Sequence, residues 1–358
     1  MAAIITEKFR LNNAKQFVED MTEGTSKAYM FVGRGHSWTD DSTPPTPVDN
    51  PNDEYDAYRN MIAMKAITSS DISHAIVRRD WTTGTTYDEY RHNYSSANTS
   101  SSSATSLWSS LYYVVTDDYN VYKCLSNGTA DGTAANASTV KPDHTTVATP
   151  TESDQYQWKY MYSISASDVI KFVTNDFLPI KTMGAKLPVH GGVSNAAGDN
   201  DGRLGDAATD DGSAQWDVEN GAVDGALDKV RLIAAGSGYT ASQSTAGIHI
   251  RGDGNGAGRA TVVTNGSGGV SSVSITTAGS GYTTAYIANE DIPGFDNASQ
   301  RADGSNVSAN IEFIIPPKNG HGADPITELG ANYVILNSRL EYAEGSGDFP
   351  TDNDFRQI

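Results

Sequence analysis

The stretch GRGHSWTDD, residues 33–41, gathers the side chains that a hydrolase uses, because His36, Ser37, Asp40 and Asp41 lie within six positions. A serine nucleophile needs an imidazole within about 3 Å, and this geometry normally joins residues distant in the sequence. Adjacent side chains on an extended chain point to opposite sides, which separates His36 from Ser37. No G-x-S-x-G nucleophile elbow occurs in the chain. We therefore predict no catalytic residue, with a hydrolase using these side chains as a competing hypothesis.

A metal site at His36, Asp40 and Asp41 lacks the regular ligand spacing of H-x₃-H or C-x₂-C sites. The other histidines are scattered, at positions 74, 92, 144, 190, 249 and 321. We therefore predict no metal ligand among these residues.

Two further stretches resemble ligand loops. DNDG (199–202) and TDDG (209–212) look like calcium loops, but aligning Gly202 with the sixth EF-hand position puts Ala197 first and leaves no glutamate at the twelfth. GDGNGAG (252–258) lacks the glycine order and the strand-to-helix context of a dinucleotide site. Asp-Gly turns explain these stretches, and we predict no cofactor.

Two charged stretches have structural interpretations. In HGADPITELG (321–330), Pro325 suits the first turn of a helix capped by Asp324, with Glu328 pointing to solvent. Arg78-Arg79 is the densest basic point and is followed at once by Asp80, which indicates an ion pair at the end of a strand.

The composition restricts the class of protein. The 358 residues carry a formal net charge of −19, which repels a phosphate backbone and argues against nucleic acid as a partner. A single cysteine, Cys124, allows no intrachain disulfide. No window approaches the roughly 20 apolar residues that span a bilayer, and the N-terminus has no signal-peptide pattern. We expect a soluble protein made in a cytoplasm, with no membrane partner.

Local patterns predict short elements joined by polar loops. We expect a helix starting near Asn12 or Asn13, an amphipathic helix over 53–68 capped by Asp53, and a short helix after residue 166 capped by Ser167 and Asp168. The 44–51 stretch should be an extended arm and the 93–106 stretch a mobile surface loop. Strands are predicted at 28–35, 74–81, 157–165 and 331–342, with a hairpin over 111–125.

An internal repeat marks a change of composition near Lys186. VRLIAAGSGYT (230–240) and VSITTAGSGYT (273–283) share seven of eleven positions, with glycines for positive-φ corners and a tyrosine packed beside each. Two copies are too few for a solenoid. We predict a mainly β chain with a core in two parts, residues 1–185 and 321–358, and an inserted Gly-rich β-repeat domain over 186–320.

Seven short motifs, in order, resemble the baseplate wedge proteins of contractile-tailed, T-even-like bacteriophages. They are TEKFR (6–10), FVGRGHSW (31–38), PPTPVD (44–49), VRRDW (77–81), VYKCL (121–125), YQWKYMYSI (156–164) and FRQI (355–358). The 186–320 stretch is longer than the corresponding link in smaller family members. In the family, further strands follow the segment resembling FRQI, so the chain ending at Ile358 suggests a truncated protein with an unpaired strand edge.

The resemblance implies a β-sandwich core with a few short helices and no catalysis. It also implies a virion protein of the tail baseplate, assembled in the host cytoplasm, with two copies per wedge and contacts to other wedge proteins. The baseplate then rearranges on host contact and triggers sheath contraction. Exposed tryptophans would anchor such contacts: Trp81 and Trp108 are candidates, Trp38 is open between interface and core, and Trp158 is predicted in the core. The alternative is a glycan-binding adhesin or accessory tail protein acting through 186–320.

Overall fold

The computed structural model describes residues 6–23, 28–33, 39–40, 42–43, 46, 50–128, 135–183, 213–295, 306–338 and 355–357. The strands named in this part of the chain pair in antiparallel sheets of two or three strands, and the helices are few and mostly short. The predicted mainly β class is confirmed. No helix among these residues is long and apolar enough to cross a membrane.

The central sheet contains β4 (Tyr113–Val115), β5 (Asn120–Asn127) and β6 (Tyr156–Ser163). The predicted hairpin over 111–125 is confirmed, with Val114 opposite Tyr122 and a turn at Tyr119 in the left-handed region. Alternate side chains of β5 enter different cores: Val121 and Leu125 join one hydrophobic cluster, whereas Tyr122 and Cys124 join another. Both faces of this sheet are therefore buried.

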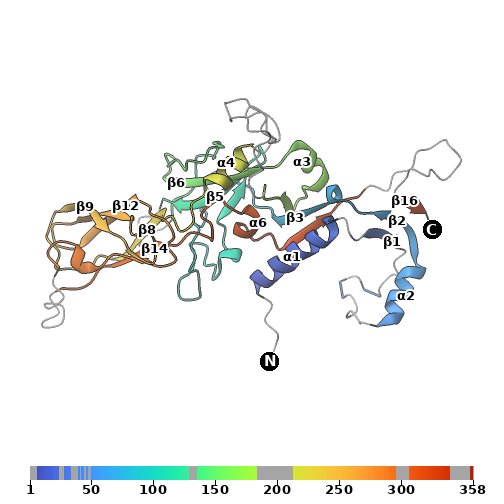
Figure 1. Ribbon diagram of the computed structural model, residues 1–358, viewed down its shortest axis with the longest axis horizontal. Helices are drawn as coiled ribbons and strands as arrows, with labels where there is room; N and C mark the ends of the chain where they lie inside the picture. Colours follow the sequence, from blue (N-terminus) through green and yellow to red (C-terminus); the bar gives the residue numbers. More distant parts are fainter. Residues whose placement is uncertain are drawn as a thin grey trace.

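A second sheet, β15 (Tyr333–Leu336), β3 (Ile72–Val77) and β7 (Phe177–Ile180), packs beside it with α1 (Glu7–Thr22) and α3 (Ala166–Phe172). Figure 1 shows α1 lying along this part of the molecule. Helix α1 begins at Glu7 instead of near Asn12, because Thr6 accepts a hydrogen bond from the Phe9 N–H. Helix α3 is capped by Ser165, two residues before the predicted Ser167.

A third sheet stands apart from the rest and contains β1 (Tyr29–Gly33), β2 (Met61–Ala66) and β16 (Phe355–Gln357), with α2 (Pro51–Arg59) beside it (Figure 1). The predicted helix over 53–68 begins earlier, at Pro51, so Asp53 lies within it instead of capping it, and the prediction is wrong after Arg59. The second half of the predicted helix, MIAMKA, pairs with β1 as a strand because that pairing overrides a weak helical period. Strand β16 pairs with the other edge of β2, so this edge of the FRQI segment is not unpaired.

Helix α4 (Ser213–Gly221) packs against β6, and its Val218 joins the hydrophobic cluster of Tyr122 and Trp158. The elements that follow it, up to residue 315, form a separate group, drawn in yellow and orange in Figure 1. They are β8 (Lys229–Ala234), β9 (Ser244–His249), β10 (Arg251–Gly252), β11 (Arg259–Thr264), β12 (Val270–Thr277), β13 (Ala285–Tyr286), η4 (Asn289–Asp291) and β14 (Asn310–Ile314). Strands β8 to β14 surround their own hydrophobic cluster, which includes Leu227, Ile250 and Phe313. We call residues 227–315 the second lobe.

The two AGSGYT turns of the second lobe have the same backbone form. Gly236 and Gly238 have positive φ in the first turn, and Gly279 and Gly281 in the second. The tyrosine after each turn is buried, with Tyr239 4% and Tyr282 2% exposed. The predicted positive-φ glycines with a packed tyrosine are therefore confirmed.

The chain returns from the second lobe through the short helix α6 (Pro325–Glu328). Asp324 caps this helix by accepting a hydrogen bond from the Thr327 N–H, and Pro325 lies in its first turn, as predicted. The predicted exposure of Glu328 is wrong, because this side chain is 1% exposed.

Candidate functional site

The opening GRGHSWTDD motif falls largely outside the described residues, including His36, Ser37, Trp38 and Asp41. Asp40 is described, and its Oδ1 accepts hydrogen bonds from the Ser42 N–H at 2.9 Å and the Ser42 hydroxyl at 2.6 Å. These bonds lower the pKa of the Asp40 carboxyl. Asp40 thus fixes a local turn.

No group of three metal-ligating side chains gathers in the described residues. The described histidines lie apart, and several are used in packing. Both DNDG and TDDG lie outside the described residues. Asp253 of the GDGNGAG stretch accepts hydrogen bonds from the Thr283 and Thr284 N–H groups at 2.9 Å each, which ties that loop to the second AGSGYT turn.

A recess of about 590 Å³ opens between the end of α1, β3 and α3. Its lining mixes apolar side chains such as Phe172 with polar ones such as Lys171 and His74. Ser73 donates its hydroxyl to the backbone oxygen of His74, so the one adjacent Ser–His pair of this recess forms no nucleophile–base contact. The recess therefore has polar side chains in its lining, but its adjacent serine and histidine do not form a nucleophile–base pair.

Glu219 on α4 is a titratable group close to neutrality. Burial raises the pKa of its carboxyl to about 7, although it accepts hydrogen bonds from the Met183 N–H at 3.0 Å and from Gln215 Nε2 at 2.7 Å. A pKa near 7 suits a general base. Here these donors occupy the carboxylate, so Glu219 ties α4 to the residues after β7.

The open sheet β1–β2–β16 exposes large apolar side chains. Tyr29 is 50%, Phe31 41% and Ile62 47% exposed, and no residue of β1 or β2 belongs to one of the three hydrophobic clusters. A small sheet without a core is marginal in water unless something packs on it. This sheet is therefore the clearest candidate contact surface among the described residues.

The outer edge of β1 also has hydrogen-bonding groups that β2 does not use. The Ile67 N–H donates to the Ala28 oxygen at 2.9 Å, which makes Ala28 and Ile67 a hydrogen-bonded pair. Bonded and non-bonded pairs alternate in antiparallel ladders, so the backbone groups of Tyr29 and Phe31 point away from β2. Strand β1 also lies at the edge of its sheet. An added strand can pair with these groups.

The predicted anchor tryptophans divide between core and partly buried positions. Trp158 is fully buried and stacks on Tyr156 at 5.4 Å between ring centroids, as predicted for a core residue. Trp81 is partly buried and donates its Nε1–H to Ser138 at 3.0 Å. Trp108 covers Gly330, where an added Cβ would overlap the Trp108 ring, so no side chain fits there.

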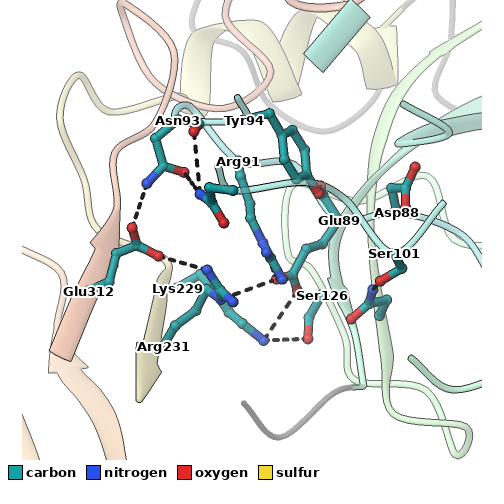
Figure 2. A network of polar contacts seen from close by, with 12 residues as sticks. Asp88, Glu89, Arg91, Asn93, Tyr94, Ser101, Ser126, Lys229, Arg231 and Glu312 are labelled. Carbon is teal, nitrogen blue, oxygen red and sulfur yellow. Dashed lines mark hydrogen bonds and ion pairs between the residues drawn. The ribbon is translucent and has the colours of Figure 1, made fainter. Parts of the chain in front are cut away.

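A buried polar network joins the second lobe to the rest of the chain (Figure 2). At its centre Glu89 is 1% exposed and pairs with Arg91 at 2.7 Å, while Lys229 and Arg231 of β8 approach it at 3.6 and 4.0 Å. Arg231 also pairs with Glu312 of β14 at 2.7 Å. Three cations thus surround two carboxylates where β8 and β14 meet the 88–101 loop.

We call this network of Glu89, Arg91, Lys229, Arg231 and Glu312 the joint. The 93–106 stretch, which was predicted to be a mobile surface loop, is tied into it. Asp88 accepts hydrogen bonds from the Ser102 N–H at 2.9 Å and from the Leu111 N–H at 2.8 Å. The Asn93 amide donates to Glu312, and Ser100 is buried. The low-complexity composition gave no sign of these contacts, since they depend on partners elsewhere in the chain.

Arg78 and Asp80 form the predicted ion pair, with Arg78 Nη2 at 2.9 Å from Asp80 Oδ1. Arg79 instead turns inward, where its guanidinium lies 4.5 Å from the Tyr113 ring centroid and donates to the Ser110 oxygen. The basic dipeptide is structural at both positions.

A buried ion pair, which sequence reasoning missed, joins Lys123 of β5 to Glu328 of α6. The two side chains are 0% and 1% exposed, and Lys123 Nζ donates to Glu328 Oε2. His321 lies nearby, edge-on to the Tyr90 ring with centroids 4.8 Å apart. Lys123 sits in an otherwise apolar strand, VYKCL, and an unpaired charge there is the one signal that could have indicated a buried partner.

Comparison with known proteins gives one family match. Residues 3–151, less than half of the chain, match the family Phage-Gp8, described as Bacteriophage T4, Gp8. The match includes five of the seven motifs that carry the resemblance to T4-like baseplate wedge proteins, and it supports that resemblance. No curated protein matches the chain.

Proposed function

Starting from the Phage-Gp8 match over residues 3–151, which implies a structural protein of the baseplate wedge, we propose that this chain scaffolds neighbouring wedge subunits in a contractile phage tail. The observation that supports a scaffold is the open sheet β1–β2–β16, which lies partly within the matched region and exposes Tyr29, Phe31 and Ile62. In the same proposal the protein is assembled in the host cytoplasm and takes part in the rearrangement that triggers sheath contraction.

The surface that we assign to self-association is the outer edge of β1. The chain carries a net charge of −19, so most approaches of a second copy bring like charges together. Strand β1 has no charged residue, and its free backbone groups at Tyr29 and Phe31 are spaced for antiparallel pairing with another β1 about a twofold axis. We propose a homodimer built across this edge.

Two substitutions test the dimer. Phe31→Asp brings one negative charge from each copy close to the proposed twofold axis, where the two charges repel, and we expect the dimer to dissociate. Ile170 on α3 is 88% exposed and lies outside the open sheet, so Ile170→Asp is the matched control and should leave the dimer intact. Sedimentation velocity distinguishes the outcomes, and a wild-type monomer at micromolar concentration would contradict the dimer alone.

Co-assembly tests the wedge function separately. The full chain is expressed with the other wedge subunits of its own phage, and stable complexes are isolated by size-exclusion chromatography. We expect the chain to enter these complexes and to turn over no substrate. Its failure to join any of them would refute the wedge proposal, whatever the oligomeric state of the isolated chain.

The added region 186–320 is a separate proposal within this function. The described residues between 227 and 315 have their own core, and β8 and β14 pair side by side at its base, which supports an independent domain grafted onto the wedge core of residues 1–185 and 321–358. A glycan-binding role for this region remains a prediction. Tyr239 and Tyr282 are buried, so a sugar would have to bind other side chains. A glycan array probed with the full chain tests this, and no signal on host surface sugars would count against it.

A further inference from the structure

Lys123 and Glu328 bring two charged groups together inside the protein. They lie 205 positions apart in sequence and are almost completely excluded from solvent. Removing two such charges from water is strongly unfavourable, and their mutual attraction offsets this only when the remaining hydrogen-bonding groups are satisfied. A neutral covalent product would avoid the burial of both charges.

The carboxyl group of Glu328 is held by backbone donors. The Gly322 N–H lies 2.8 Å from Oε1 and 3.0 Å from Oε2, and the Asp324 N–H lies 3.1 Å from Oε1. Two N–H groups therefore converge on Oε1, while Oε2 faces Lys123 Nζ. Backbone donors aimed at one oxygen stabilise the negative charge that develops there when a nucleophile adds to the carbon.

The amine of Lys123 is placed for attack on that carbon. Its Nζ contacts the carboxyl and lies 5.3 Å from the centroid of the Tyr90 ring. Burial lowers the pKa of Lys123, which favours the neutral, nucleophilic amine. Fixing both groups in contact replaces an encounter in solution by an intramolecular step, which is the largest advantage that position alone can give.

A buried imidazole lies against the same aromatic ring. His321 is 7% exposed, and its Nδ1 has no hydrogen-bond partner in the described part of the chain. Burial lowers the pKa of His321, so the ring is neutral, and nearby Lys123 lowers it further. An unpartnered, neutral imidazole on the same ring that Lys123 Nζ approaches can accept a proton and release it again.

We propose that Lys123 and Glu328 condense into an intramolecular amide bond, with His321 moving the proton. The ammonium first transfers a proton to the carboxylate, which gives a neutral amine and a carboxylic acid. The Nζ lone pair attacks Cδ, forming the C–N bond, and His321 carries a proton from Nζ to the departing hydroxyl. The C–O bond breaks and one water leaves, so no oxidant, reductant or cofactor is needed.

The cross-link would close a loop that contains the whole second lobe. It joins the central sheet to α6, just after the chain returns from that lobe. A mechanical force applied to the second lobe would then act on a covalent bond before it could separate β5 from the neighbouring strands. The inference does not depend on the proposed wedge function, since the chemistry is set by these residues alone.

Mass spectrometry of the purified full chain in denaturant tests the proposal directly. We expect a mass lower than that of the sequence by one water. Trypsin should fail to cleave after Lys123, and the digest should contain a branched peptide joining Lys123 to Glu328. Lys159 is the matched control, because it is also buried but donates to the Val147 backbone oxygen at 2.7 Å, so cleavage after it should be normal.

Three variants separate the bond from the ion pair. Lys123→Arg keeps the positive charge and cannot form the amide, and Glu328→Ala removes the acyl group, so both should show the unmodified mass. His321→Phe keeps a ring against Tyr90 and should raise the fraction of unreacted chain. A wild-type protein at its full sequence mass, with separate Lys123 and Glu328 peptides, would overturn the proposal, as would a water loss that maps to other residues.

Discussion

Glu89 and Lys229 face each other across the joint of the molecule, with Lys229 Nζ 3.6 Å from Glu89 Oε2. Glu89 belongs to the loop that precedes the central hairpin, and Lys229 is the first residue of the strand that leads into the second lobe. The contact therefore connects two hydrophobic cores through charge. The Glu89 side chain is almost fully buried, so the joint is sensitive to the loss of this one carboxylate.

Glu89→Gln should weaken the joint strongly. The substitution leaves Arg91, Lys229 and Arg231 partly or fully buried around one remaining carboxylate, and breaking a buried pair in this way costs roughly 3–5 kcal/mol of unfolding free energy. Urea unfolding measures the effect. Asp117→Asn is the control: Asp117 is 79% exposed beside Lys141, so its loss should have a much smaller effect on stability. Equal effects of the two substitutions would contradict the assignment.

The second AGSGYT turn provides two glycines that differ in their surroundings. A Cβ added to Gly281, φ 72°, would meet nothing closer than the Gly254 Cα at 3.9 Å, whereas a Cβ on Gly279, φ 65°, would lie 2.6 Å from the Tyr282 ring. Gly281→Ala should cost about 1–2 kcal/mol from backbone strain alone. Gly279→Ala should cost about 1–3 kcal/mol more because the ring must move. Thermal unfolding of both variants gives the difference, and a reversed order would refute the packing described.

Glu219 should make stability depend on pH near neutrality. Its pKa is raised from 4.5 to about 7 in the folded chain, so between these values the folded state binds more protons than the unfolded state. Stability from this group therefore falls as pH rises through that window. Glu219→Gln removes the titration, so its stability relative to wild type should rise between about pH 5 and pH 8. A flat Glu219→Gln curve would contradict the prediction.

The hairpin over 111–125 was predictable because two β-branched and aromatic runs flank turn residues, and local pairing is visible in a local pattern. The helix over 53–68 was wrong after Arg59 because the partner that converts MIAMKA into a strand lies some 30 residues earlier. The same limit applies to charge. Glu328 looked like a solvent-facing residue of a short helix, and only the fold places it against Lys123.

The joint shows most clearly that contacts between distant segments cannot be predicted from local sequence patterns. Asn93 and Glu312 are 219 positions apart, and nothing in the polar 93–106 stretch indicates that it will be held by a strand of another lobe. The AGSGYT repeat is the opposite case, because its glycines and tyrosines specify their own turn geometry. Predictability therefore followed sequence distance: contacts within a turn or hairpin were predicted, and contacts between distant segments were not.

The base of the second lobe has a consequence for how such a chain can change. Lys229 and Ile314 are direct partners in the β8–β14 pairing, so the chain leaves and returns within one strand spacing, about 4.8 Å. A two-residue turn can span that gap. Replacing the lobe by such a turn would therefore leave the chain path of the surrounding core unchanged.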